Sequence, residues 1–193
     1  GVSIGSDQHN GLQKPFDLPL VAYAVDVNGS PVAGVTVTFT APANGASGTF
    51  QSTNTNTTSV ITDETGLAIS PIFTSNSQSG TYQVTATAPG IVAPLNFQMT
   101  NMDWFVSSSG NDSNSCQSPL APCLTINGAI NKASNGEVIK VASGTYTGSG
   151  SQVANITKGL DILGGWNSNF TTQTGFTIID GDNARHGITV NSP

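Results

Sequence analysis

Four residues near the end of the chain have side chains that could carry acid–base chemistry. In the segment IIDGDNARHGI, Asp180 and Asp182 supply carboxylates, and Arg185 and His186 supply basic groups. Neighbouring aspartates serve as acid and base in glycoside hydrolysis, and carboxylate oxygens are ligands that calcium accepts. Asp-Gly-Asp-Asn is also an ordinary turn sequence. We therefore predict a solvated turn here and no catalytic residue.

A second oxygen-rich segment, GNDSNS at residues 110–115, contains Asp112. Its carboxylate, amide and hydroxyl oxygens are ligands that calcium accepts, but the segment lacks the spacing and the closing bidentate glutamate of an EF-hand. Asp112, Asp180 and Asp182 are the candidate calcium ligands. We predict neither a bound metal nor another cofactor.

Four aromatic residues of the second half, Trp104, Tyr146, Trp166 and Phe170, are candidates for glycan contact. Aromatic rings on an open β surface can stack on sugars, and the same rings are also large apolar groups suited to a core. Both interpretations follow from the residue types alone.

The two cysteines, Cys116 and Cys123, are separated by six residues in the segment SCQSPLAPC. The only histidines, His9 and His186, are distant in sequence, which makes a zinc site a poor fit, and the CxxC spacing of redox enzymes is absent. We predict a disulfide, which indicates an oxidising compartment.

The composition of the chain argues against nucleic acid as a partner. Only 8% of residues are charged, the net charge is −6, and no basic cluster occurs, so a phosphate backbone would be repelled. Apolar runs are too short to cross a membrane as a helix, and the start GVSIGSDQHN lacks the pattern of a signal peptide. We expect no nucleic-acid partner and no membrane insertion.

Residues 16–100 alternate short β-rich runs with turn signals, as in a β-sandwich. Apolar residues that alternate along each run predict which face of each strand points into the core. Asn28-Gly29 predicts a hairpin-like turn between the first two strands. The inward sets are Val21, Tyr23, Val25 and Val27; Val35, Val37 and Phe39; Val60 and Thr62; Leu67 and Ile69; Tyr82, Val84 and Ala86; Leu95, Phe97 and Met99.

The ordered blocks PLVAYAVDVNGSPVAGVTVTFTAP, GASGTF, TDETGLA and SGTYQVTATAPG resemble bacterial Ig-like domains of the invasin and intimin type. The resemblance covers residues 12–101 and leaves residues 1–11 as an N-terminal extension. It implies a rigid spacer or an adhesive tip of a cell-surface protein, without catalytic residues.

In residues 102–193 the pattern changes. Ile126, Ala129, Ile130 and Ala133 recur at helical spacing, with Thr125 suited to cap the start and Gly136 to provide a left-handed end. The short strands EVIKVASGTYTG, ITKGLDILGGW, FTIIDGD and HGITV follow at intervals typical of stacked coils.

This second half resembles the amino-terminal part of a right-handed parallel β-helix of the pectin-lyase-like kind. The resemblance rests on the cap helix, the cysteine pair and the GTY and GGW turns in this order. It implies that the helix covers the open edge of the first coil. Members of that fold include polysaccharide lyases and hydrolases, whose clefts lie on middle coils.

We therefore predict an all-β chain: an Ig-like β-sandwich followed by a short right-handed parallel β-helix with an N-terminal capping helix. The predicted function is a structural or adhesive module of a secreted bacterial cell-surface or matrix protein. The alternative is a carbohydrate-binding or polysaccharide-degrading β-helix protein, in which surface glycans are the partners.

The segment HGITVNSP ends on a strand without a closing helix, so we expect something to cover the last coil. Further coils of a longer parent chain could do so, or another copy in head-to-tail stacking that yields a filament. The segment of residues 1–11, in which Val2 and Ile4 alternate, is a candidate assembly strand.

Overall fold

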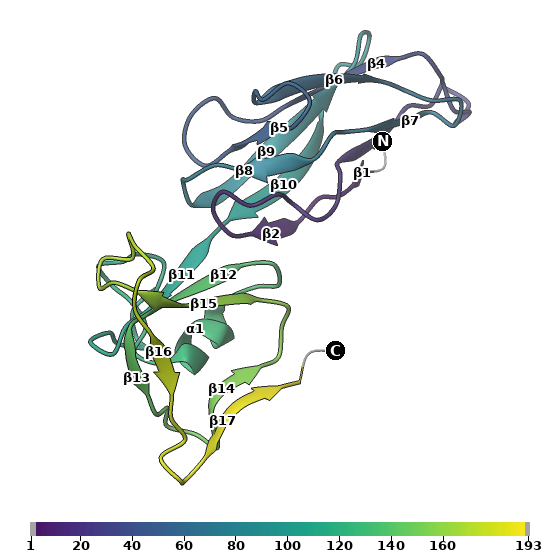
Figure 1. Ribbon diagram of the computed structural model, residues 1–193. Coiled ribbons are helices and arrows are strands. Elements are labelled where there is room, and N and C mark those ends of the chain that lie inside the picture. The colour runs from purple at the N-terminus through teal and green to yellow at the C-terminus, as the bar shows by residue number, and fades with distance from the viewer. Residues whose placement is uncertain (1–2, 192–193) are drawn as a thin grey trace. The chain divides into compact units, whose positions relative to one another are not determined.

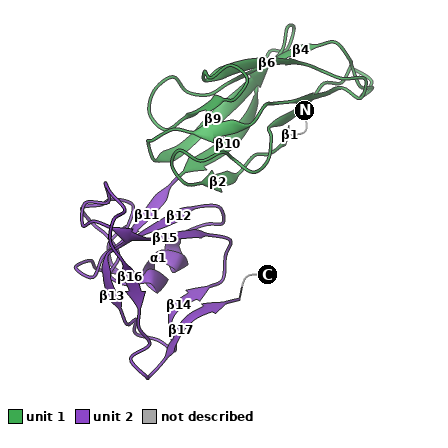
Figure 2. Cartoon of the chain, in the orientation of Figure 1, with its two compact units in different colours: residues 1–101 green, residues 102–193 purple. Residues whose placement is uncertain are grey.

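The computed structural model describes residues 3–191, and the chain divides into two compact units, residues 1–101 and 102–193 (Figure 2). Strands dominate both units, which confirms the prediction of a chiefly β chain. The strands of the first unit are β1 (Ser3–Ile4), β2 (Gln8–Asn10), β3 (Val21–Tyr23), β4 (Thr36–Thr40), β5 (Gly48–Phe50), β6 (Thr57–Ile61), β7 (Leu67–Ile69), β8 (Phe73–Ser75), β9 (Gly80–Thr87) and β10 (Leu95–Asn101).

The elements of the second unit include the helix found within residues 3–191. They are β11 (Asp103–Val106), α1 (Ile126–Lys132), β12 (Val138–Ala142), β13 (Gly144–Tyr146), β14 (Gln152–Ile156), β15 (Asp161–Trp166), β16 (Thr177–Ile179) and β17 (His186–Val190). Figure 1 shows these elements in chain order by colour.

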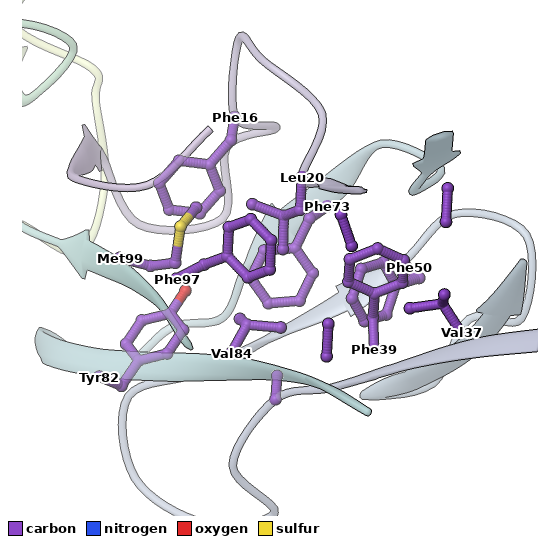
Figure 3. Close-up of a cluster of buried hydrophobic side chains, with 14 residues drawn as sticks. Phe16, Leu20, Val37, Phe39, Phe50, Phe73, Tyr82, Val84, Phe97 and Met99 are labelled. Carbon is purple, nitrogen blue, oxygen red and sulfur yellow. The ribbon is translucent and has the colours of Figure 1, made fainter. Parts of the chain in front are cut away.

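Three sheets form the first unit. Their strand orders are β2-β10-β9-β4-β6, β1-β3-β7 and β5-β8, and all pairs are antiparallel except β2 with β10. One buried cluster takes side chains from all three sheets (Figure 3). Its largest fully buried members are Phe39, Phe50, Phe73, Phe97, Leu20, Met99 and Val84.

The alternation expected in β4, β9 and β10 is confirmed. Val37 and Phe39 are buried in β4, and Val84 and Phe97 are fully buried on the paired strands β9 and β10. Because successive side chains of a strand point to opposite faces, each strand of this sheet presents one apolar face to the core.

The predicted hairpin is confirmed only close to its turn, where Val25 pairs antiparallel with Pro31 and the Val32 N–H donates to the Ala24 carbonyl over 3.0 Å. Asn28-Gly29 does form a turn, in which the Gly29 N–H donates to the Asp26 carbonyl over 3.1 Å. However, β3 pairs with β1 and β7, whereas β4 pairs with β6 and β9, so the chain changes sheet between them. Val27, expected to point inward, is fully exposed in the loop.

The inward faces predicted for β3 and β7 are confirmed only in part. Ala22 and Ala68 belong to the core cluster, and Ile69 is 50% exposed. Val21, which pairs directly with Ile69, is buried at 9% exposure but does not belong to that cluster. Both strands carry apolar residues in succession, so period two alone could not decide which face is buried.

Residues 3–10, which the sequence sets apart as an extension, belong to the sheets of the first unit. Ile4 pairs with Val21, and Gln8 pairs with Met99. The Gln8 amide adds hydrogen bonds to the Gly5 and Leu18 carbonyls, of 2.8 Å and 3.0 Å. Val2 lies outside the described residues.

The second unit is a stack of coils built from parallel pairs. β11 pairs with β12 and β12 with β15, β13 pairs with β16, and β14 pairs with β17, all parallel. The chain thus passes through three strand positions, β12-β13-β14, and returns to each in the same order as β15-β16-β17. Figure 1 shows β13 beside β16 and β14 beside β17.

The predicted helix is confirmed at its start and corrected at its end. The Thr125 hydroxyl accepts a hydrogen bond from the Gly128 N–H over 2.9 Å, as an N-cap does. The C-cap is Ala133, in extended conformation, whose N–H donates to the Ala129 carbonyl. Gly136 has the expected positive φ but lies in the following turn, where its N–H donates to the Gly159 carbonyl.

Candidate functional site

The cysteine pair forms the predicted disulfide. Cys116 and Cys123 are bonded, with 5.0 Å between their Cα atoms, and both are fully buried. The main chain on either side is joined to β11, because Phe105 donates to the Cys116 carbonyl and Cys123 donates to the Phe105 carbonyl. The disulfide therefore fixes the loop that leads from β11 into α1.

The carboxylate of Asp112, a candidate calcium ligand, accepts hydrogen bonds from residues at the start of α1. One carboxylate oxygen accepts from the Leu124 and Thr125 N–H groups, each over 2.9 Å, and the other accepts from the Thr125 hydroxyl over 2.7 Å. The carboxylate also lies directly against Gly128, where a Cβ would collide with it. These contacts give Asp112 a structural role at the helix start.

Asp180 and Asp182 lie in the predicted turn. The Asp182 N–H donates to the Asp180 carboxylate over 2.8 Å, and Asp182 has positive φ. Arg185 donates to the main-chain carbonyls of Thr147 and Gly150 over 2.9 Å and 3.1 Å. The side chains of this segment therefore hold the turn against the preceding coil. Within residues 3–191, no three His, Cys, Asp or Glu side chains gather into a metal-binding group.

The four candidate aromatic residues do not share one surface. Trp104 and Tyr146 belong to the main core of the second unit and are 6% and 4% exposed. The Trp104 indole N–H donates to the buried Glu137 carboxylate over 2.6 Å, and the Tyr146 hydroxyl donates to the Ala142 carbonyl over 3.0 Å. Burial raises the pKa of Tyr146.

Trp166 and Phe170 belong to a second, smaller cluster. Phe170 packs edge-on against Phe105, with 5.0 Å between ring centroids. The Lys140 ammonium lies 4.8 Å from the Trp166 ring centroid and 2.7 Å from a carboxylate oxygen of Asp103. The Lys140 ammonium, held between the Trp166 ring and the buried Asp103 carboxylate, is already neutralised. The aromatic residues of this cluster cover the outer face of β11, β12 and β15.

The inward face of the last described coil of the second unit is apolar and only partly covered. Within residues 3–191, β15, β16 and β17 each pair with a named strand on one side only, and the end of β15 is also bridged by Trp166 to Gln173. We call their inward side chains the last-coil surface: Ile162, Thr177, Ile179, Ile188 and Val190.

Burial falls sharply from one coil to the next at this surface. Ala154 in β14 is 2% exposed, and Ile188, its partner in β17, is 56% exposed. Likewise, Ile139 is fully buried while its partner Ile162 is half-buried. Each inward side chain is covered by the next coil, and the last coil has no such cover among the described residues.

An apolar hollow opens at the last-coil surface. Its volume is about 410 Å³, and every residue around it is uncharged. The lining residues are Ile126, Val141, Ala154, Ile156, Leu160, Ile162, Gly164, Thr177, Ile179 and Ile188. Unpaired strand edges around an apolar hollow are suited to further β-structure, because such a partner supplies hydrogen bonds and apolar side chains together.

The opposite side of the coil stack is closed by α1, through residues that the sequence analysis did not single out. The Asn127 amide donates to the Gln152 carbonyl over 3.1 Å and accepts from the Asn155 N–H over 2.7 Å. The Lys158 ammonium donates to the carbonyls of Ile130 and Ala133 at the helix end. Asparagine in a helix and lysine in a loop are common, so the sequence carries no signal for these roles.

Ile4, the described part of the candidate assembly strand, is paired within its own unit. It lies beside Val21 in β3 and is 57% exposed. Its strand is therefore already engaged, which leaves the last-coil surface as the better candidate for assembly.

Comparison with known proteins supplies no relative: no family model, no curated protein and no solved structure matches this chain. No helix within residues 3–191 has the length and apolarity needed to cross a membrane.

Proposed function

We propose that the chain is a structural or adhesive module of an extracellular bacterial surface or matrix protein. In this proposal the first unit is an Ig-like β-sandwich and the second is the amino-terminal part of a right-handed parallel β-helix. The order of parallel pairs from β12 to β17 supports the β-helix interpretation. The buried disulfide is compatible with an oxidising, extracellular compartment.

The observation that carries the proposal is the uncovered last-coil surface. A stacked repeat buries its apolar face only against a neighbouring repeat. A further coil packed on β17 would therefore bury the exposed side chains of Ile188 and Val190. In a solution of residues 1–193, the partner able to supply it is a second copy of the chain. In a longer chain, further coils of the same protein would supply it instead, and in either case the second unit would be one part of a larger stack.

Light scattering of residues 1–193 over a wide range of concentration tests this proposal. We expect the mass to rise with concentration, and Ile188→Lys to shift the protein towards the monomer because a charge would enter the apolar hollow. Ile178→Lys is the matched control, since Ile178 is 55% exposed but lies on a neighbouring strand at an outward position paired with Thr145.

A mass that stays monomeric at every concentration would contradict the assembly. Equal loss of assembly in the Ile178→Lys variant would also contradict it, because the effect would then not depend on the hollow. Circular dichroism of both variants shows whether each remains folded.

A polysaccharide-degrading function is the other candidate that the sequence suggests. The hydrogen bonds of Asp180 and Arg185 with the main chain favour the structural role of that turn. Reducing-sugar release from pectin-like polymers, measured with and without calcium, tests the enzymatic function, and robust turnover would overturn our proposal.

A further inference from the structure

A second hollow, which shares only Ile126 with the hollow at the last-coil surface, has the lining of a ligand-binding groove. It lies where the loop before α1 faces β13 and the turn after it, and its volume is about 290 Å³. Ser108 and Leu124 line it from the earlier segment, and Thr145, Thr147 and Ser149 line it from the later one. We call it the hydroxyl groove.

The hydroxyl groups of this groove are free to bind a ligand. The side chains of Ser108, Thr145, Thr147 and Ser149 all line the groove and are exposed, and within the described part of the chain none of their hydroxyls forms a hydrogen bond. A hydroxyl both donates and accepts, so the two walls together offer several donors and acceptors without charge.

The main chain of β13 adds one more donor and acceptor. The Gly144 N–H donates to the Phe176 carbonyl and the Tyr146 carbonyl accepts from the Asp180 N–H, each over 3.0 Å, so both residues are paired towards β16. Thr145, between them, directs its N–H and carbonyl to the opposite side, where the hydroxyl groove lies.

Apolar groups complete the groove. Leu124 is 43% exposed at its wall, and Ile126, Tyr146 and Val153 contribute buried apolar surface. No charged residue lines it. The nearby Arg185 is occupied by the carbonyls of Thr147 and Gly150.

We propose that the hydroxyl groove binds a neutral carbohydrate through its free hydroxyls, the Thr145 main chain and the apolar Leu124 wall. A neutral sugar presents many hydroxyls and apolar C–H faces, which match this mixture of groups. A uronic-acid polymer would lack a cationic partner here. An added peptide strand would gain main-chain hydrogen bonds from Thr145 alone, because β13 has only three residues.

This inference names the class of ligand that the proposed adhesive module would bind. It rests on the proposed function only for the place where that binding would occur, the bacterial surface or matrix. The groove and the last-coil surface are tested separately, because Ile188→Lys should leave sugar binding unchanged. Failure of one proposal therefore does not imply failure of the other.

An array of neutral and uronic-acid-containing oligosaccharides, together with a library of extended peptides, tests the assignment on residues 1–193. We expect neutral oligosaccharides to bind. The double variant Thr145→Val, Thr147→Val should raise their dissociation constant about tenfold, because it removes two hydroxyls at nearly constant side-chain size. Thr49→Val, which changes an exposed strand threonine of the first unit, is the control and should bind as the unchanged chain does.

Three results would overturn the proposal: no neutral oligosaccharide bound, binding that the double variant leaves unchanged, or binding of peptides alone. Circular dichroism of the double variant establishes that a loss of binding is not a loss of fold.

Discussion

Asn127 in α1 accepts a hydrogen bond of 2.7 Å from the main-chain N–H of Asn155 in β14. Its amide also donates to the Gln152 carbonyl of the same strand. One side chain thus supplies a donor and an acceptor to a strand edge that would otherwise need a neighbouring strand. This contact explains how a helix can close one side of a stack of coils.

Replacing Asn127 by alanine should destabilise the second unit by about 1–3 kcal/mol, because it leaves two main-chain groups of β14 without partners. Urea denaturation measures the change. Asn131→Ala, at an exposed position of the same helix, should change the stability by less than about 0.5 kcal/mol. Equal effects of the two substitutions would show that Asn127 does not act through β14.

The disulfide closes a short loop, and its removal should cost about 2.5 kcal/mol on the chain-entropy model. The double variant Cys116→Ser, Cys123→Ser tests this by denaturation under non-reducing conditions. Intact mass with and without reductant checks the bond itself. Two thiols that react with an alkylating agent in native, unreduced protein would contradict the pairing.

Asp112→Ala should destabilise the start of α1 by about 2–3 kcal/mol, because three hydrogen bonds to a carboxylate are lost. Asp112→Asn should cost less, since an amide oxygen can still accept from the two N–H groups. Because these bonds occupy both carboxylate oxygens, we expect the same melting temperature in calcium and in a chelator. A rise in calcium alone would instead assign Asp112 to a metal site.

Gly66 and Gly29 form a matched pair, because both have positive φ, +77° and +85°. A Cβ on Gly29 would meet open space, whereas one on Gly66 would lie 2.6 Å from the Ala24 carbonyl oxygen. Gly29→Ala should cost about 1 kcal/mol, for the left-handed backbone alone. Gly66→Ala should cost clearly more in thermal or urea denaturation, and equal costs would refute the close approach.

Tyr82 should make the first unit sensitive to alkali. Its hydroxyl donates to the Asn101 amide oxygen over 2.9 Å, and burial raises its pKa well above the ordinary value of 10.0. A raised pKa in the folded state contributes stability that is present below about pH 10 and is lost as the pH rises further.

Tyr82→Phe should therefore weaken the loss of stability above about pH 10, as measured by urea denaturation at neutral and alkaline pH. At neutral pH the variant should be less stable by about 1–2 kcal/mol, because Asn101 loses a buried partner. An unchanged alkaline dependence would show that other groups control it.

The features that the sequence alone determined are local. Phe39, Val84 and Phe97 stand in long strands whose apolar residues alternate strictly, so period two identified their buried face. Thr125 caps the helix that it immediately precedes, and Cys116 and Cys123 close a short loop. Each depends on residues close together in the chain.

The tertiary structure decided what depends on distant partners. In β3 and β7 apolar residues follow one another, and the pairing of β3 with β7 places Ala22 and Ala68 in the core cluster. Val21 is buried outside that cluster, and Ile69 is half exposed. The hydroxyl groove and the last-coil surface also arise from stacking, because they bring together residues of different coils. The spacing of residues in the sequence does not identify such contacts, because the stacking of the coils determines which residues meet.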